Sequence, residues 1–111
     1  METRFIYMTA ATMDEAKKIG RILLEKRLAA CINLLDPMHS MYWWKGRVEE
    51  SREVVLIAKT ARHLVPALTA AVKENHSYEC PCIVSLPVES GNPDFLKWIS
   101  DETGASPTTE E

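Results

Sequence analysis

The feature that most constrains this chain is a long β-hairpin centred on the pair Lys45-Gly46. Residues 38–44 and 47–59 both have the composition of strands, and Gly46 supplies the positive φ that a tight turn requires. A strand over 47–59 extends for roughly 43 Å at ~3.3 Å per residue. A compact domain of about 100 residues measures about 34 Å across. The hairpin is therefore predicted to project beyond its own domain.

Three aromatic residues, Tyr42, Trp43 and Trp44, follow one another just before the turn. Successive side chains of a strand point to opposite faces, so one sheet face cannot cover all three. Each of these side chains typically buries ~150–250 Å², and leaving them on a monomer's projecting arm would create a sticky patch. We therefore expect another copy of the chain to cover them. The alternative is a hairpin that folds back over its own core.

The rest of the chain gives the element order β-α-β-β-α-β, followed by a third helix. Thr12 and Glu15 form a capping box that opens the first helix, and Asn92 followed by Pro93 opens the last one. Asp36-Pro37 interrupts the second strand, and the proline predicts a bulge there. The strands are expected at residues 3–10, 28–44, 47–59 and 83–88, and the helices at 12–28, 60–76 and 92–99.

This order predicts an α+β fold, a ferredoxin-like sandwich with an antiparallel four-stranded sheet and two helices on one face. The 111 residues allow one core, so residues 1–103 are expected to form a single domain. The polar segment 104–111 is expected to be a disordered tail.

Composition and charge argue against several kinds of partner. The net charge is −3 and the basic residues are scattered, so no nucleic-acid partner is expected. No apolar run approaches the ~20 residues of a membrane span, and the N-terminus lacks the features of a signal peptide. The three cysteines are an odd number, which favours a reducing cytoplasm over a disulfide framework.

His76, Cys80 and Cys82 are the candidate metal ligands, because imidazole and thiolate suit copper and zinc. The alternative for His76 is a residue that satisfies the last carbonyls of the second helix. Alternatively, the two cysteines are buried in the core and pack there as small apolar residues. No nucleophile–base pair, glycine-rich phosphate loop or paired carboxylates stand out, so no enzymatic activity is expected.

Six motifs, in order, resemble those of the CutA divalent-cation tolerance proteins. The first reads Lys-Arg-Leu-Ala-Ala-Cys-Ile-Asn at 26–33, and the second, Tyr-Trp-Trp-Lys-Gly-Arg-Val-Glu at 42–49, includes the hairpin tip. The others are Glu53 with Lys59-Thr60, then residues 76–81, 85–88 and 94–99. The resemblance extends over residues 4–100, nearly the whole chain.

The resemblance implies a cytoplasmic homotrimer assembled through the hairpins, with a role in tolerance of divalent metals, copper above all. It implies no catalytic activity and no cofactor required for folding. In some members copper lies on a first-strand cysteine and two adjacent histidines. Here Met8 and Asn75 occupy two of those positions, and His76 the third.

The resemblance also places five residues around the clefts between subunits: Tyr42, Trp44, Glu53, Lys59 and Tyr78. Aromatic walls with one acid and one lysine suit a small polar ligand. The same residues would equally suit an interface, in which aromatic side chains anchor one subunit to the next. The alternative function is therefore that of a PII-like signalling or scaffold trimer, which binds a small ligand or a partner protein in these clefts.

Overall fold

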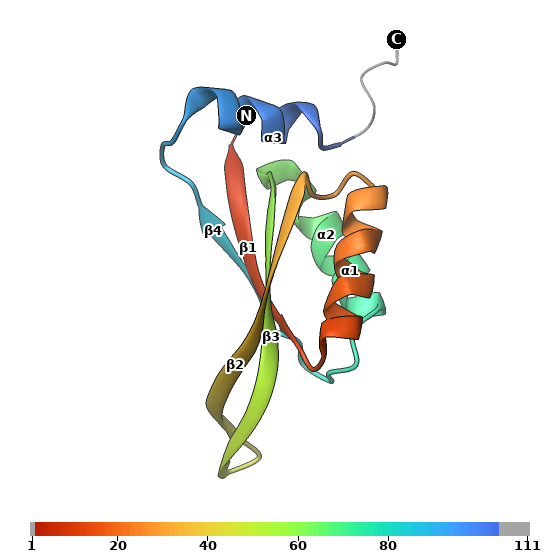
Figure 1. The fold of residues 1–111 in the computed structure, drawn as a ribbon, viewed down its shortest axis with the longest axis vertical. Helices are drawn as coiled ribbons and strands as arrows, with labels where there is room; N and C mark the ends of the chain where they lie inside the picture. The colour runs from red at the N-terminus through yellow and green to blue at the C-terminus, as the bar shows by residue number, and fades with distance from the viewer. Residues whose placement is uncertain (1, 105–111) are drawn as a thin grey trace.

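The computed structural model describes residues 2–104, which form one four-stranded sheet and three α-helices (Figure 1). The predicted tail, 104–111, lies outside the described residues apart from Gly104. In chain order the elements are β1 (Thr3–Ala10), α1 (Met13–Glu25), β2 (Cys31–Trp44), β3 (Arg47–Ala61), a 3-10 turn (Arg62–Leu64), α2 (Val65–Glu74), β4 (Ile83–Pro87) and α3 (Pro93–Asp101).

The sheet has the strand order β2-β3-β1-β4, and every neighbouring pair is antiparallel. Helices α1 and α2 cover one face of it, whereas α3 lies across the end at which β1 begins (Figure 1). The face opposite α1 and α2 is called the open face below. The predicted element order and the two helices on one face are confirmed.

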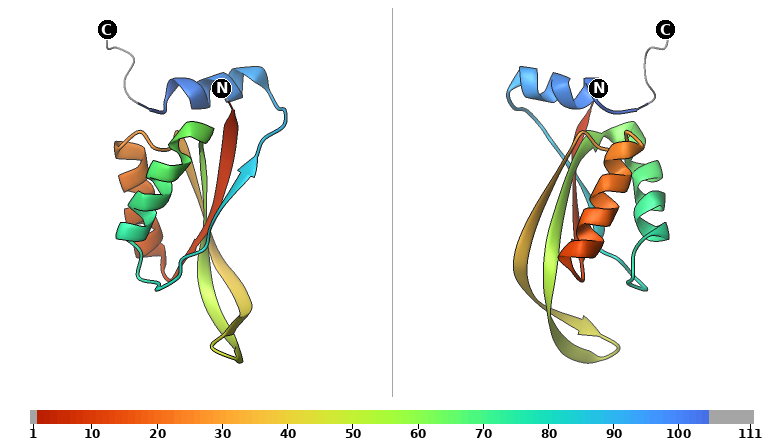
Figure 2. Two further views of the ribbon diagram at one scale, coloured as in Figure 1. Left: turned by 180° about the vertical axis from the view of Figure 1, so that it is seen from behind. Right: turned by 45° about the vertical axis from the view of Figure 1, so that its right-hand side comes forward.

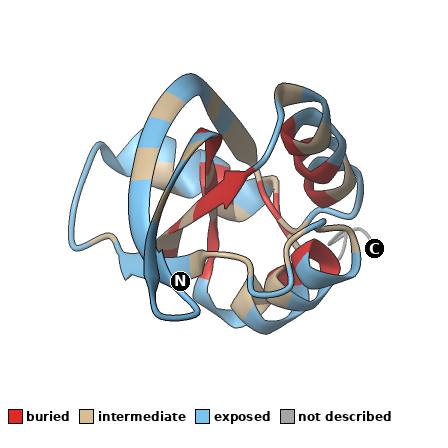
Figure 3. Ribbon diagram, turned by 90° about the horizontal axis from the view of Figure 1, so that it is seen from below, coloured by how far each residue is buried: buried red, intermediate tan, exposed pale blue. Residues whose placement is uncertain are grey.

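The core lies between the sheet and the two helices, and alternate strand residues contribute to it. Figure 3 shows the buried residues in red. From the strands the core takes Ile6, Met8 and Ala10 of β1 and Val54, Leu56 and Ala58 of β3; from the helices it takes Ala16, Ile19, Leu23, Leu68, Ala71 and Val72. Helical spacing of three and four residues puts each helix's set on one side, so both helices bury an apolar stripe against the sheet.

The hairpin projects well past the ends of α1 and α2, as the views from behind and from the side show (Figure 2). The molecule measures 52 × 27 × 22 Å, which confirms the predicted overhang. Lys45 and Gly46 have φ of 51° and 80°, the two positive values of a type I′ turn. The hairpin does not fold back over the core, and Trp43 at its tip is 74% exposed.

The predicted bulge is present in β2, where the register shifts between Leu35 and Met38. Leu35 faces Val55, but Met38 faces Glu53, so three steps along β2 match two along β3. The extra residue inverts the alternation of β2, because directly paired residues point to the same face. Beyond the bulge the residues on the open face are Met38, Ser40, Tyr42 and Trp44; before it they are Cys31, Asn33 and Leu35.

Of the predicted boundaries that were wrong, three have a clear physical cause. β2 begins at Cys31 and not at residue 28, because Arg27 takes a positive φ of 58° and turns the chain after α1. β3 continues to Ala61, because Thr60 and Ala61 still pair with the start of β1. The second helix therefore begins at Val65, after a 3-10 turn, with Pro66 in its first turn as predicted.

The cap of α3 is confirmed, since the Asn92 side chain accepts a hydrogen bond from the Asp94 N–H. The two aromatic residues of α3, Phe95 and Trp98, do not join the core. Both are more than one-third exposed and stack on each other with ring centroids 5.7 Å apart, while Ile99 alone of this helix is fully buried. No helix within residues 2–104 has the length and apolarity needed to cross a membrane.

Candidate functional site: an aromatic groove at the root of the hairpin

A groove of about 800 Å³ lies on the open face, where the hairpin leaves the body of the domain. Its walls come from β1, β2, β3 and the segment between α2 and β4. It brings together predicted residues of both kinds: Tyr42, Trp44, Glu53 and Tyr78 of the predicted cleft, and Cys80 and Cys82 of the predicted metal site. A second hollow, of about 560 Å³, lies beside α3 and contains none of the predicted site residues.

Tyr42 and Trp44 reach the groove because of the β2 bulge, which turns them to the same face as Glu53. Eight further lining residues were not predicted as site residues, and Tyr7, Thr9, Met38 and Met41 are among them. The first two carried a signal in the alternation of β1, since Ile6 and Met8 point into the core and odd-numbered residues point the other way. The Tyr7 hydroxyl donates to the Met38 Sδ at 3.4 Å, which joins β1 to β2 across the groove floor.

Glu53 places a carboxylate on the groove wall although the residue is only 8% exposed. The Tyr78 hydroxyl donates to its Oε2 at 2.8 Å. Burial, together with this hydrogen bond to a carboxylate, raises the pKa of Tyr78 well above its usual range, so the phenol stays protonated and keeps donating. Burial and the nearby Glu53 charge also raise the pKa of the Cys82 thiol.

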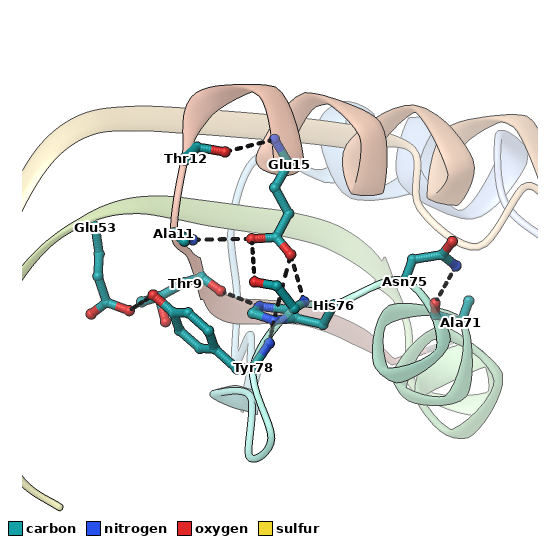
Figure 4. Close-up of polar contacts among 10 residues, drawn as sticks. Thr9, Ala11, Thr12, Glu15, Glu53, Ala71, Asn75, His76 and Tyr78 are labelled. Carbon is teal, nitrogen blue, oxygen red and sulfur yellow. Dashed lines mark hydrogen bonds and ion pairs between the residues drawn. The ribbon is translucent and has the colours of Figure 1, made fainter.

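The His76 side chain is 1% exposed and lies outside the groove lining. Figure 4 shows its polar contacts. Its Nε2 is 2.7 Å from the Thr9 carbonyl oxygen, and its Nδ1 accepts the Tyr78 N–H at 3.0 Å. A carbonyl can only accept, so Nε2 carries the proton and the ring is neutral. Both ring nitrogens are therefore occupied in fixing the segment that carries Tyr78.

The alternative role foreseen for His76, that of satisfying the end of α2, belongs to its neighbour. The Asn75 side-chain amide donates to the Ala71 carbonyl oxygen at 2.8 Å (Figure 4). His76 instead connects the segment between α2 and β4 to β1, through the Thr9 carbonyl oxygen. It acts as a positioning residue for Tyr78, whose ring packs against it with centroids 4.7 Å apart.

Glu15 holds the same segment from the helix side. The Thr12 hydroxyl accepts the Glu15 N–H at 3.1 Å, which confirms one half of the capping box. The other half differs, because the Glu15 carboxylate accepts the Ala11 N–H and both the N–H and the hydroxyl of Ser77 instead of the cap residue's own N–H. Burial raises the pKa of Glu15, but the hydrogen bonds from Ser77 and Ala11 outweigh it and lower the pKa overall.

Replacing Glu15 with Gln is expected to lower the free energy of unfolding at pH 7 by about 1–2 kcal/mol, because a charged acceptor of three hydrogen bonds is lost. A carboxyl group with a lowered folded pKa stabilises above the usual glutamate value of about 4.3 and loses that effect as pH falls through the folded value. Urea unfolding from pH 7 to pH 3 measures this. The variant's acid-side slope should be shallower than that of Glu25→Gln, an exposed control on the same helix; parallel slopes would contradict the role of Glu15.

Lys59 does not line the groove. Its ammonium donates to Asn33 Oδ1 and to Cys31 Sγ, and lies 5.5 Å from the ring centroid of Phe5 and 5.8 Å from that of Phe95. It therefore lies nearer to α3, on the same open face. Within one protomer the predicted group of Tyr42, Trp44, Glu53, Lys59 and Tyr78 comes together without its lysine.

The three predicted metal ligands do not all reach the groove either. Cys80 is exposed and Cys82 half-buried, and both line the groove, whereas His76 lies outside the lining with both nitrogens engaged. Across residues 2–104 no three or more His, Cys, Asp or Glu side chains are grouped so as to hold a metal ion. One protomer thus offers thiols in an aromatic groove and no preformed centre of that kind.

The architecture defines a class of small α+β proteins: a four-stranded antiparallel sheet, helices on one face and a long projecting hairpin. The model of the family described as CutA1 divalent ion tolerance protein matches residues 4–102. The chain belongs to this family.

Individual relatives agree. The chain is 46% identical to the Archaeoglobus fulgidus divalent-cation tolerance protein CutA over 99 residues, 89% of this chain and 95% of that protein. It is 46% identical to mouse Protein CutA over 97 residues, 87% of this chain but only 55% of the mouse protein, so it spans about half of that relative's length.

Solved structures show the same fold. The rice CutA1 crystal structure has a TM-score of 0.91 at 35% identity and covers 94% of this chain and 95% of its own. The structure of the Archaeoglobus fulgidus protein, described as a periplasmic divalent cation tolerance protein, has a TM-score of 0.88 at 42% identity. It covers 90% of this chain and 97% of its own.

Proposed function

We propose that this chain forms a homotrimer that contributes to divalent-cation tolerance, copper above all, in the cytoplasm. The observation that carries the proposal is the projecting hairpin with its exposed aromatic tip. Leu35, Val84 and Leu86 on the open face are also about half exposed. Large exposed apolar surfaces of this kind mark association sites. The number of three subunits rests on the family resemblance.

The element order and the sheet order β2-β3-β1-β4 support a ferredoxin-like protomer. The cytoplasmic location rests on the cysteines, all three of which are free thiols. The proposed role is one of assembly and binding, without catalysis and without a cofactor needed for folding.

Metal binding in this proposal falls to Cys80 and Cys82. Both thiols line an accessible groove, and soft thiol ligands favour monovalent copper. His76 joins them only by giving up two hydrogen bonds. We therefore assign His76 to positioning the segment and the thiols to the metal.

Titration of Cu(I) against a chromophoric competing chelator tests this assignment. The Cys80→Ser/Cys82→Ser variant is expected to bind roughly tenfold more weakly or worse, a loss of about 1.4 kcal/mol or more. Cys31→Ser is the matched control, since it removes a thiol that contacts Lys59 and does not line the groove. Equal Cu(I) affinities for the native protein and the double variant would show that Cys80 and Cys82 do not bind the metal.

A second candidate function, a signalling or scaffold trimer, is favoured by the groove itself. Its volume lies within the ~300–1,000 Å³ typical of small-molecule sites, and four aromatic residues line it. Lys59 does not line the groove, so its positive charge is not available there to bind an anionic ligand.

A further inference from the structure

The inference concerns the charge state of the groove, and it begins with Glu53. This residue is more than nine-tenths buried, and its side chain lines the groove. Its Oε2 accepts the Tyr78 hydroxyl, and its Oε1 has no hydrogen-bond partner among residues 2–104. No lysine, arginine or histidine of the described chain forms an ion pair with it. A carboxylate removed from water is stabilised by a cation, and Glu53 has none.

The rest of the lining adds negative charge and no fixed positive charge. Glu79 contributes a second carboxylate, and no lysine or arginine lines the groove. His39, the one histidine there, is 2.8 Å from Glu50 on the neighbouring strand. A concave site lined by one sign of charge concentrates ligands of the opposite sign. The groove therefore selects cations and rejects anions.

The walls favour an organic cation over a bare ion. Tyr7, Tyr42, Trp44 and Tyr78 all line the groove, and aromatic faces attract ammonium and guanidinium groups. Trp44 already has a cation near its ring, the Lys45 ammonium at 5.7 Å from the centroid. Met38 and Met41 add flexible apolar surface that suits an aliphatic body. A hard divalent ion instead needs several oxygen ligands at once, and the described residues include no such cluster.

We propose that the groove binds a small organic cation, an ammonium or guanidinium group on a slim aliphatic body, with Glu53 as its counter-charge. The charged head lies against Glu53 Oε1, and the aliphatic body lies along Tyr42, Trp44 and Tyr78. The Tyr78 hydroxyl, by donating to Oε2, orients the carboxylate. This function goes beyond metal tolerance and uses neither Cys80 nor Cys82, which line the same groove.

The test is a titration of the native, full-length protein with four probes of matched body: n-butylammonium, n-butylguanidinium, butan-1-ol and butyrate. Isothermal calorimetry gives the affinity, and NMR follows the ring resonances of Tyr42 and Tyr78. The two cations are expected to bind with dissociation constants on the order of millimolar, as befits ligands of few atoms. Butanol should bind much more weakly, and butyrate should not bind.

Glu53→Gln removes the charge and keeps the shape and the acceptor for Tyr78. It is expected to weaken n-butylammonium binding roughly tenfold, the loss of a charge-assisted hydrogen bond. Glu25→Gln, which removes the same charge from the exposed side of α1, should stay within about twofold of the native protein on the same scale. Native mass spectrometry of each variant separates a lost ligand from a lost assembly.

Three results would overturn the proposal. One is equal binding of n-butylammonium and butan-1-ol to the native protein, a comparison that needs no variant. Another is undiminished binding by a folded Glu53→Gln protein. The third is no cation binding at all because a lysine or arginine of a second copy already occupies the groove, as a crystal structure of the assembly would show. Any of these would leave the proposed trimer intact.

Discussion

Replacing Trp44 with Ala and Gly46 with Val in one protein is expected to release monomers from the proposed trimer. Gly46 has a φ of 80°, which a β-branched residue adopts only with strain, so the turn is distorted. Trp44 lies on the open face of the hairpin tip, and the substitution removes its aromatic surface from the expected contact. The loss of a tryptophan anchor typically costs ~2–4 kcal/mol, which corresponds to an affinity roughly 30- to 1,000-fold weaker.

Native mass spectrometry and light scattering at micromolar protomer concentration measure this change. Trp98→Ala is the matched control, since it removes a comparably exposed tryptophan from α3, remote from the hairpin tip. It should remain assembled. Persistence of the trimer in the Trp44→Ala/Gly46→Val protein would show that subunits are held together elsewhere on the open face.

The second large effect is expected at His76. Substitution by Ala leaves the Thr9 carbonyl and the Tyr78 N–H without partners and opens a cavity. Unsatisfied buried groups cost about 1–3 kcal/mol each, so the free energy of unfolding should fall by about 3 kcal/mol.

His63→Ala provides the comparison, because His63 is exposed and lies in the 3-10 turn outside the groove. It should change stability by less than about 0.5 kcal/mol. Urea unfolding at a fixed protomer concentration and in the presence of a metal chelator measures both, so that assembly and metal contribute equally. A native-like stability of His76→Ala in chelator would mean that the ring is no structural support and would return it to the candidate ligands.

Much of the fold follows from local sequence signals. The alternation of β1, the Thr12 and Asn92 caps and the Lys45-Gly46 turn each depend on a few adjacent residues, and the structure shows all of them. The errors in the fold arise where distant pairing overrides local preference. Thr60 and Ala61 join β3 because β1 offers them partners, a fact that no window around residue 60 contains.

The site was foreseen in part for a related reason. Family motifs pointed to Tyr42, Trp44, Glu53 and Tyr78, which do meet in one groove. The same motifs included Lys59, which the strand register places six residues from Glu53 along β3 and beside Phe5 instead. The contacts of His76 with Thr9 and of Glu15 with Ser77 cross 67 and 62 residues of chain, so no local pattern indicates them.

The bulge at Asp36-Pro37 has a consequence for how hairpin tips of different relatives should be compared. If the alternation of faces is counted from the start of β2, every residue beyond the bulge is assigned to the wrong face of the sheet. Removing one residue between Leu35 and Met38 would remove the bulge and leave Met38, Tyr42 and Trp44 paired with Glu53, Glu49 and Arg47 on the open face. Two relatives with the same tip sequence, one with the bulge and one without it, would thus present the same tip surface, although counting from the start of β2 would assign opposite faces to it. Equivalence between tips is best assigned by counting back from the turn.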